Sequence, residues 1–306
     1  MQRAVAVLAV LLACSLTASP AAASAPQATA SETKATEEEA ALPPGMRRFG
    51  LWDYLATAAT LGSYYAVEFG LDGPSKPIWT RPVPVIDAQA RELFALDSRS
   101  GRRTADAVSD YAWYGTTVYP VVAALAAPLA RGKGADFVWQ LSMMNLQAYA
   151  AASLLVRIPH RLIGRTRPAA SECERDPGYS NVCGTDQRYV SFYGGHTTIA
   201  MTGAGLSCAH HLHAELFGDP QADRLMCAAA LTLGGVAFVT RMQADKHWLS
   251  DQLVSVAVGL GVGYGLPTLL YYHPLWGDDE SAQSRDWMLT PMVGEGSVGA
   301  SWLGRF

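Results

Sequence analysis

Six long apolar stretches dominate this 306-residue chain and restrict the folds open to it. They are residues 50–71, 105–130, 135–158, 196–217, 222–241 and 248–272. Their lengths favour helices, and none shows the sustained alternation of apolar and polar residues that is typical of strands. Only 16% of the residues are charged, which fits helices that are broadly buried or in contact with lipid. The pattern predicts an all-α bundle of about six core helices.

The two ends of the chain differ from this helical core. Residues 1–25 have the pattern of a secretory signal peptide, in which Arg3 precedes a short apolar run and a group of small residues. Residues 26–46 are small and acidic, which is typical of a flexible linker. The helical domain is therefore expected to span 47–278. In the tail, 279–306, apolar and small residues surround Gly-Glu-Gly-Ser and predict a β-hairpin.

Export determines how the cysteines are interpreted. Cys173 and Cys183 flank a loop rich in Pro, Gly and Asn, and an oxidising compartment would let them form a disulfide. Cys208 and Cys227 lie in apolar runs, where we interpret them as small buried thiols, with a disulfide as the alternative. Cys14 follows Leu-Leu-Ala, which resembles a lipoprotein processing site, so a lipid anchor is an alternative to signal cleavage further along the chain.

Polar residues inside the apolar stretches favour a soluble exported domain, in the periplasm or cell envelope, over an integral membrane protein. Asp53, Glu68, Asn145 and the His-His-Leu-His run at 210–213 would each be costly in a bilayer. Membrane association remains the alternative. The net charge is −4 and the basic residues are scattered, which excludes an electrostatic footprint for nucleic acid. The oligomeric state is not indicated by the sequence.

The chemistry-bearing residues concentrate in three stretches, 160–168, 191–200 and 240–251. The first is rich in arginine, whose forked donors match phosphate oxygens. The second places glycines directly before an expected helix, where backbone N–H groups can approach an anion. Together they predict a site for a tetrahedral oxyanion, with His196 beside it as a proton donor.

The third stretch combines Arg241, His247 and Asp251. If the chain is helical from His247, the Asp251 carboxylate lies one turn further on, beside the imidazole. It could then hold one ring nitrogen and leave the other to act as nucleophile or base. The alternative is an ordinary polar pair on a wet helix face.

These three stretches resemble the motifs of the type 2 phosphatidic acid phosphatase (PAP2) superfamily, which includes bacterial acid phosphatases and vanadium haloperoxidases. The family pattern is Lys, six residues, Arg-Pro; then Pro-Ser-Gly-His; then Ser-Arg, five residues, His, three residues, Asp. The third motif is complete here except for Thr240 in the serine position. The first keeps Arg167 and Pro168 but has His160 in place of lysine.

The second motif keeps its glycine and histidine, as Gly195 and His196, while Tyr193 and Gly194 replace proline and serine. The order and spacing of the motifs agree with the family across 160–251, and the six apolar stretches extend the likeness to 47–275. The resemblance therefore implies a PAP2-like helical bundle.

The resemblance also implies a role for each matching residue. His247 would attack phosphorus and form a phosphohistidine, with Asp251 holding its second ring nitrogen. His196 would protonate the departing alkoxide and then activate water. The phosphate oxygens would be bound by Arg167, Arg241, Gly195, Gly194 and His160. No metal and no cofactor is implied for the phosphatases, and vanadate would bind as an inhibitor or, in a haloperoxidase, as the prosthetic group.

Two departures from the pattern bear on activity. His160 lacks the permanent charge of lysine, although a protonated imidazole, or Arg157 or Arg161, could supply it. Gly194 lacks the hydroxyl donor of serine, for which Tyr193 is a possible replacement. We therefore expect an exported, metal-independent acid phosphatase or lipid phosphate phosphatase. The alternatives are a non-catalytic protein that binds phosphate or phospholipid, and a vanadate-dependent haloperoxidase.

Two further polar runs are not assigned to the site. The histidines at 210–213 are interpreted as a wet helix end rather than a metal site, because no pair among them has the i,i+4 spacing. The run Asp-Ser-Arg-Ser-Gly-Arg-Arg at 97–103 is interpreted as a solvated turn, with contact to an anionic substrate as the alternative. A phosphorylated small molecule or lipid is the expected substrate, and its identity is left open.

Overall fold

The computed structural model describes residues 42–274, 287–294 and 297–304. The predicted signal peptide, the lipidation alternative at Cys14 and most of the predicted linker lie outside the described residues. The division of the chain at residues 46 and 278 stays a prediction.

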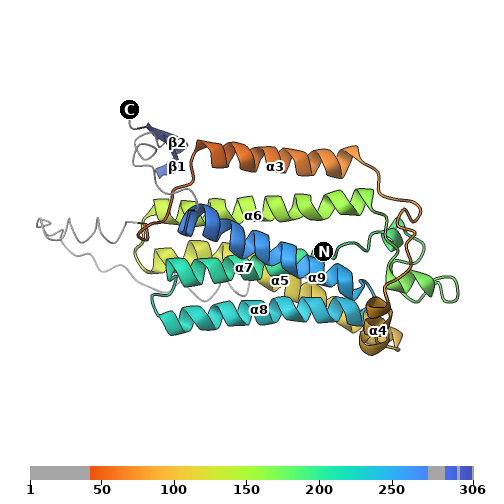
Figure 1. The fold of residues 1–306 in the computed structure, drawn as a ribbon. Helices are drawn as coiled ribbons and strands as arrows, with labels where there is room; N and C mark the ends of the chain where they lie inside the picture. Colours follow the sequence, from red (N-terminus) through yellow and green to blue (C-terminus); the bar gives the residue numbers. More distant parts are fainter. Residues whose placement is uncertain (1–41, 275–286, 295–296, 305–306) are drawn as a thin grey trace, which may run out of the picture. The chain divides into compact units, whose positions relative to one another are not determined.

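Long helices build the described domain (Figure 1). They are α3 (Leu51–Gly70), α4 (Val85–Phe94), α5 (Arg99–Ala130), α6 (Ala135–Leu162), α7 (Gly195–Ala214), α8 (Pro220–Gln243) and α9 (Leu249–Leu260). α9 continues into two π-helical segments, η3 (Gly261–Gly265) and η4 (Thr268–Tyr272). Two short 3₁₀ turns, η1 (Pro168–Ser171) and η2 (Asp186–Tyr189), lie between α6 and α7. The all-α fold is confirmed for residues 42–274.

The helix α5 begins earlier than the apolar pattern indicated. It starts at Arg99, and the Ser98 side chain caps it by accepting the Gly101 N–H at 3.1 Å. A serine cap followed by arginines, which favour helices, explains this start. The interpretation of 97–103 as a solvated turn is therefore wrong for all but its first two residues.

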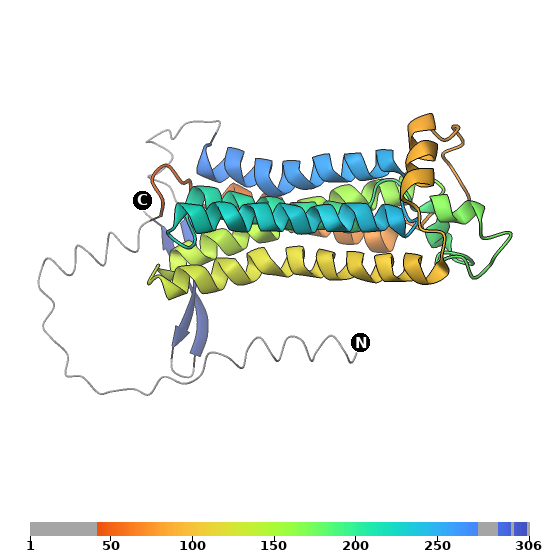
Figure 2. The same ribbon diagram turned by 90° about the horizontal axis from the view of Figure 1, so that it is seen from below.

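Helix α7 lies at the centre of the bundle and packs against α5, α6, α8 and α9 (Figures 1 and 2). Its sequence is rich in Gly, Ala and Thr, which lets neighbouring backbones approach closely. A Cβ atom at Gly203 would lie 2.0 Å from the carbonyl oxygen of Thr116 in α5. On another side, a Cβ at Gly205 would lie 2.7 Å from the backbone nitrogen of Tyr264 in η3. The absence of side chains at these positions allows the bundle to close around α7.

A larger apolar cluster fills the end of the bundle where α6 begins. Phe49, Leu141, Met144 and Tyr271 are buried there together, and the rings of Phe49 and Tyr271 stack with their centroids 5.4 Å apart. The cluster joins the segment before α3 to α6 and to η4. It therefore ties the first and last helical elements of the domain together.

Two disulfides occur among the described residues. One joins Cys173 to Cys183 in the loop between α6 and α7. The other joins Cys208 in α7 to Cys227 in α8, with 4.3 Å between their Cα atoms. The interpretation of Cys208 and Cys227 as free buried thiols is therefore wrong, because the two neighbouring helices place them face to face. That pairing depends on helix packing, which sequence spacing does not reveal.

Two of the three histidines at 210–213 do not belong to a wet helix end, whereas His213 in the last turn of α7 is partly exposed. His210 and His211 are fully buried. His211 donates from Nδ1 to Asp223 Oδ1 at 2.5 Å and accepts from the Tyr119 hydroxyl at 2.7 Å. His210 donates from Nε2 to Asn145 Oδ1 at 2.9 Å. These histidines connect helices through buried hydrogen bonds, which is how buried polar groups are normally accommodated.

Polar side chains within the apolar stretches are buried in the bundle or lie near helix ends. Gln140, Asn145 and Gln147 are all buried. Asp53 and Glu68 lie in the first and last turns of α3. Positions inside the bundle or at helix ends would let these side chains avoid lipid, so the choice between a soluble and a membrane-embedded domain stays a prediction. By length and composition, two described helical segments, Pro220–Gln243 and Leu249–Tyr272, are able to cross a membrane.

The strands β1 (Trp287–Gly294) and β2 (Ser297–Gly304) pair antiparallel, with Thr290 opposite Ser301. The packing of such a ribbon on the helical domain stays a prediction.

The helix directions bring the three motif stretches to one end of the bundle. The C-terminal ends of α6 and α8 and the N-terminal ends of α5, α7 and α9 meet there, beside α4 (Figure 1). The segment 163–194 covers this end. Residues far apart in the sequence can therefore converge on one site.

The close approach at Gly203 predicts a large cost for any side chain there. We expect Gly203→Ala to lower the free energy of unfolding by more than about 2 kcal/mol, because the new methyl group meets backbone rather than a movable side chain. Gly235→Ala in α8 is the control, since a Cβ there meets nothing within 4 Å and alanine favours helix. Thermal unfolding of both variants measures this. Equal stability of the two would contradict the packing described for α7.

Candidate active site

The structure brings the predicted residues of all three motifs together. Arg167 follows α6, His196 lies in the first turn of α7, Arg241 in the last turn of α8, and His247 in the loop before α9. The charges of Arg167 and Arg241 act on both histidines and lower the pKa of each, after burial. The two guanidinium groups therefore lie within electrostatic reach of both imidazoles.

The imidazole of His247 is held in one orientation by the backbone. Its ring is 4% exposed, and Nδ1 donates to the carbonyl oxygen of Ser191 at 2.8 Å. Because a carbonyl oxygen can only accept, this bond places the proton on Nδ1 and leaves a lone pair on Nε2. Burial, followed by Arg167 and Arg241, lowers the pKa of His247 well below its usual value. The ring is therefore neutral at neutral pH, as a nucleophile must be.

Asp251 does not hold His247 in the way that the sequence predicted. The helix α9 begins at Leu249, so His247 is outside it and the helical i,i+4 geometry does not apply. The Asp251 carboxylate instead caps this helix, accepting the Trp248 N–H at 3.1 Å, and accepts the Ser191 hydroxyl at 2.6 Å. Ser191 thus stands between Asp251 and the nucleophile, and its carbonyl takes the place expected for the carboxylate.

Arg165 joins two buried carboxylates beneath the site. Its guanidinium contacts Asp87 Oδ2 of α4 at 2.6 Å, Ser250 Oγ at 2.8 Å and Asp251. The sequence placed Arg165 in an arginine cluster that would bind an oxyanion. In the structure its donors are taken by protein acceptors, so its role is to position α9 and the Ser191 turn. Asp87 and Ser191 were missed, since nothing in their local sequence distinguishes them.

Unlike Arg165, Arg167 and Arg241 have N–H groups without a hydrogen-bond acceptor among the described residues. They are 7% and 5% exposed. The Nε atom of each is buried without a hydrogen-bond partner among the described residues. Arg241 also contacts Asp106 Oδ1 at 2.6 Å. Burial and the neighbouring Arg241 lower the pKa of Arg167 to about 9, so it stays charged at neutral pH. Buried charge with unused donors is costly unless an anion is bound there.

His196 faces the same region from the start of α7. Its Nε2 lies 3.1 Å from Asp110 Oδ1, and its ring centroid is 4.9 Å from that of Trp113. Burial and the two arginines lower the pKa of His196 to about 3. A phosphate dianion between these groups would oppose that effect, because it favours the imidazolium. The geometry suits an imidazole that exchanges a proton with a bound ester.

His160 does not replace the missing lysine as a cation. Its Nε2 donates to the carbonyl oxygen of Tyr193 at 2.7 Å, and burial lowers its pKa to about 4. It is therefore neutral at neutral pH and supports the turn before α7. Arg157 and Arg161, the other residues expected to supply the lysine charge, form ion pairs elsewhere. They contact Glu68 Oε2 at 2.5 Å and 3.1 Å.

The glycines of the second motif lie in close contact with side chains of neighbouring helices. A Cβ at Gly194 would lie 2.8 Å from Gln252 Oε1 of α9, and one at Gly195 would lie 3.2 Å from a methyl group of Val156. A serine at 194 would therefore displace the buried Gln252 side chain. The departure from the family pattern at this position reflects the close contact between the turn and α9.

Lys246 is a buried cation that the sequence interpretation passed over. Its side chain is 4% exposed, with Nζ 3.3 Å from Asp106 Oδ2 and bonded to Asn181 Oδ1. Burial lowers its pKa to about 8, and its charge contributes to lowering the pKa of His196. Lys246 therefore remains mostly charged at neutral pH within reach of the site. The position of Lys246 directly before His247 in the sequence could have identified it as a candidate site residue.

The comparisons with known proteins agree with this geometry. Residues 138–274 match the family model described as the PAP2 superfamily. These residues are similar to the PAP2 superfamily. The match contains the three motif stretches, and it confirms the resemblance found in the sequence. No curated protein and no solved structure matches the chain. Similarity to the PAP2 superfamily points to phosphatase-type activity on phosphate esters.

A cavity of about 600 Å³ opens beside the candidate active site. Arg167 and Trp248 form part of its wall, and the segment Pro77–Val83, which includes Trp79, forms another part. Its mixed apolar and cationic lining suits the alcohol portion of a phosphate ester. Among the described residues, no group of His, Cys, Asp or Glu side chains is arranged to hold a metal ion.

The Arg165 network predicts that Asp87 is essential for stability although it is remote from the nucleophile. We expect Asp87→Ala to lower the free energy of unfolding by about 3 kcal/mol, because it leaves half of a buried guanidinium unpaired. Asp72→Ala, which removes an exposed carboxylate, is the control and should change it by less than about 0.5 kcal/mol. Chemical denaturation measures both. Equal effects would show that Arg165 does not depend on Asp87.

Proposed function

We propose that this protein is a metal-independent phosphatase that hydrolyses phosphate monoesters through a phosphohistidine on His247. One observation carries the proposal: a neutral imidazole with Nε2 unprotonated lies within electrostatic reach of two buried guanidinium groups whose Nε donors lack partners among the described residues. A dianionic phosphoryl group would satisfy the donors and present phosphorus to the nucleophile.

The first step transfers the phosphoryl group to the protein. Nε2 of His247 attacks phosphorus, the N–P bond forms, and the P–O bond to the alcohol breaks. His196 donates its proton to the departing oxygen, and Asp110 stabilises the imidazolium form before transfer. The Ser191 carbonyl accepts from Nδ1–H throughout, so the positive charge that develops on the ring of His247 is stabilised.

The second step releases phosphate. His196, now neutral, takes a proton from water, and the water oxygen attacks phosphorus as the N–P bond breaks. Arg167 and Arg241 bind the non-bridging oxygens in both steps. Lys246 supplies the additional positive charge that lysine supplies in the family motif, acting across Asp106. These side chains provide the charge that a metal ion would otherwise bring, and vanadate is expected to inhibit by occupying the same position.

The nucleophile is tested by substitution. We expect His247→Ala to lower kcat on a generic phosphomonoester by at least about 10³-fold with the fold intact, because the covalent route is lost. His273→Ala is the matched control, since His273 is exposed beyond the opposite end of α9. Rapid quenching with a ³²P-labelled substrate should trap label on the parent protein and not on His247→Ala.

Two outcomes would contradict this proposal. Near-normal turnover by His247→Ala would remove the proposed nucleophile. Vanadate-dependent oxidation of halide without ester hydrolysis would favour a haloperoxidase. The absence of activity in both assays would favour a non-catalytic phosphate-binding protein.

We also propose that the bundle is embedded in a membrane, with phosphorylated lipids as substrates. Large apolar side chains are exposed around the bundle, on α3, α5, α6, α8 and α9. Trp52 and Leu129 are examples, 80% and 62% exposed. Only 39% and 28% of the most apolar parts of Pro220–Gln243 and Leu249–Tyr272 are buried, whereas the core helix of a soluble protein is mostly buried. An apolar surface of this extent is normally covered.

The distribution of charge supports the same proposal. Each long helix has a central stretch without charged residues, and the charges lie toward the ends. The stretches are 54–67, 111–130, 137–156, 197–209, 225–240 and 252–272. At 1.5 Å per residue these helical lengths are about 20 to 32 Å, comparable to the hydrocarbon core of a bilayer. The active site lies beyond one end of these stretches, where lipid headgroups would meet it.

Membrane insertion is tested by extraction and by a matched pair of charged substitutions. We expect the protein to remain with membranes at alkaline pH and to require detergent for release. Leu125→Arg, in the charge-free part of α5, should reduce the amount of membrane-inserted protein severalfold, since a charge there is costly in lipid. Leu93→Arg, at an exposed position of α4 outside these stretches, is the control. Release of monodisperse protein without detergent would contradict the proposal.

A further inference from the structure

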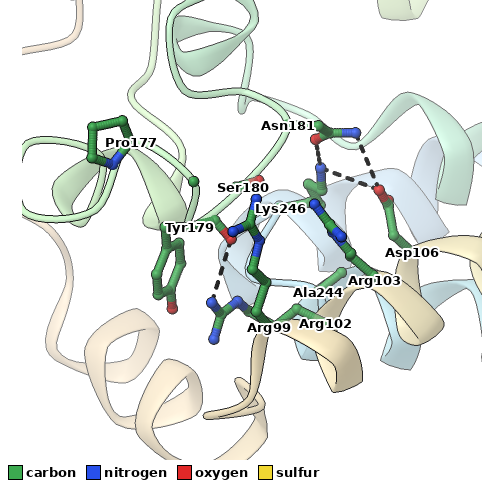
Figure 3. Close-up of a pocket in the computed structure, with 11 residues that line it drawn as sticks. Arg99, Arg102, Arg103, Asp106, Pro177, Tyr179, Ser180, Asn181, Ala244 and Lys246 are labelled. Atoms are coloured by element: carbon green, nitrogen blue, oxygen red, sulfur yellow. Dashed lines mark hydrogen bonds and ion pairs between the residues drawn. The ribbon is translucent and has the colours of Figure 1, made fainter.

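A second cavity, of about 220 Å³, lies at the N-terminal end of α5 (Figure 3). The first turns of α5 form one wall, and the loop residues 177–181 form the opposite wall. Ala244 and Lys246, from the chain between α8 and α9, complete the lining. The cavity is thus bounded by the same loop that carries the nucleophile.

The lining of this cavity is strongly cationic. Four basic side chains contribute to it, against a single carboxylate, Asp106. The basic residues are Arg99, Arg102, Arg103 and Lys246. Asp106 is already in contact with Arg241 and Lys246, so its charge is offset from two sides. The remaining excess of positive charge attracts an anion.

Two of these cations are buried in the wall. Arg102 is 6% exposed, and its guanidinium stacks on the Tyr179 ring at 3.6 Å from the centroid. Its terminal nitrogens donate to carbonyl oxygens, including that of Asp97 at 2.7 Å, while Nε is buried without a partner among the described residues. Lys246 is similarly buried. Arg102 has no carboxylate in direct contact among the described residues, and Lys246 shares Asp106 with Arg241.

The other two cations extend over the opening. Figure 3 shows Arg99 and Arg103 reaching from α5 toward the loop that carries Tyr179 and Asn181. The Arg99 guanidinium lies against Gly178, where a Cβ would be 2.7 Å from its Nη1. Neither arginine forms an ion pair with any residue in the described ranges 42–274, 287–294 and 297–304. The positive end of the α5 dipole adds to their charge.

The cavity and the active site share a wall. Lys246, which lines the cavity, is the chain neighbour of His247. Asp106 contacts Lys246 on the cavity side and Arg241, one of the two phosphate-binding arginines, on the other. An anion in the cavity would therefore lie close to a phosphoryl group bound at His247.

We propose that this cavity binds a second phosphate group of the substrate. The preferred substrates would then carry two phosphates, one cleaved at His247 and one held by Arg99 and Arg103 above the buried Arg102 and Lys246. This inference rests on the proposed phosphatase function for its account of turnover. Binding of a doubly phosphorylated compound, however, is independent of catalysis.

The inference is tested by binding of non-hydrolysed and simple probes to the purified full chain. The probes are inorganic orthophosphate, inorganic diphosphate and 1,3-propanediol bisphosphate, measured by calorimetry on the His247→Ala background to prevent turnover. We expect at least one two-phosphate probe to bind about tenfold or more tightly than orthophosphate, because two charge-assisted contacts act together.

Arg99→Ala combined with Arg103→Ala should remove that advantage and leave the affinity for orthophosphate within about twofold. Both arginines are exposed, so the fold should tolerate their loss. Arg175→Ala is the matched control, since it removes an exposed arginine of the neighbouring loop that lines neither cavity. On the parent protein, the same double substitution should raise KM for a bisphosphate and leave hydrolysis of a simple monophosphate ester unchanged.

The outcomes separate this inference from the proposed function. If no two-phosphate probe binds more tightly than orthophosphate, or if the double substitution weakens all probes equally, the second phosphate site is refuted even when monoesters are hydrolysed. If the parent protein hydrolyses nothing but the two-phosphate advantage depends on Arg99 and Arg103, the site stands and the phosphatase proposal fails.

Discussion

The arrangement of the active site depends on the buried guanidinium of Arg165. It bridges Asp87 in α4 and Asp251 in α9, and Asp251 in turn binds the Ser191 hydroxyl. The Ser191 carbonyl then orients His247. Segments 60 to 86 residues apart in the sequence are thereby held together by charge-assisted hydrogen bonds away from water. Such bonds are strong there, and their loss is costly. The position of the nucleophile follows from this network.

The cationic side chains at the active-site end of the bundle fall into two groups. Arg165, Arg157 and Arg161 are matched by carboxylates and hold helices together. Arg167 has an unused donor and no carboxylate in direct contact among the residues that the structure describes, and Arg241 shares Asp106 with Lys246. Positive charge without a matching carboxylate therefore lies beside His196 and His247, and more lines the neighbouring cavity at the start of α5. Binding of an anionic ligand there is favoured, because it would offset the free-energy cost of burying these guanidinium groups away from water.

Much of the fold could be predicted from the sequence, because helix length and apolar content are local properties. The motif spacing likewise identified His196, His247, Arg167 and Arg241, and the structure brings them together. What could not be predicted are interactions that depend on tertiary packing. The pairing of Cys208 with Cys227, the burial of His210 and the replacement of Asp251 by the Ser191 carbonyl all arise from which helix faces which. The earlier start of α5 could have been predicted, since Ser98 is a recognisable N-cap residue.

The bond from His247 Nδ1 to the Ser191 carbonyl has a consequence for how such a site would be examined by mutagenesis. Because the acceptor belongs to the main chain, alanine scanning cannot delete it, and every single side-chain replacement at position 191 preserves the oxygen. The tautomer of the imidazole is thus encoded in the path of the polypeptide rather than in any one side chain. A mutational survey would miss this contributor, although the covalent chemistry of the ring depends on it.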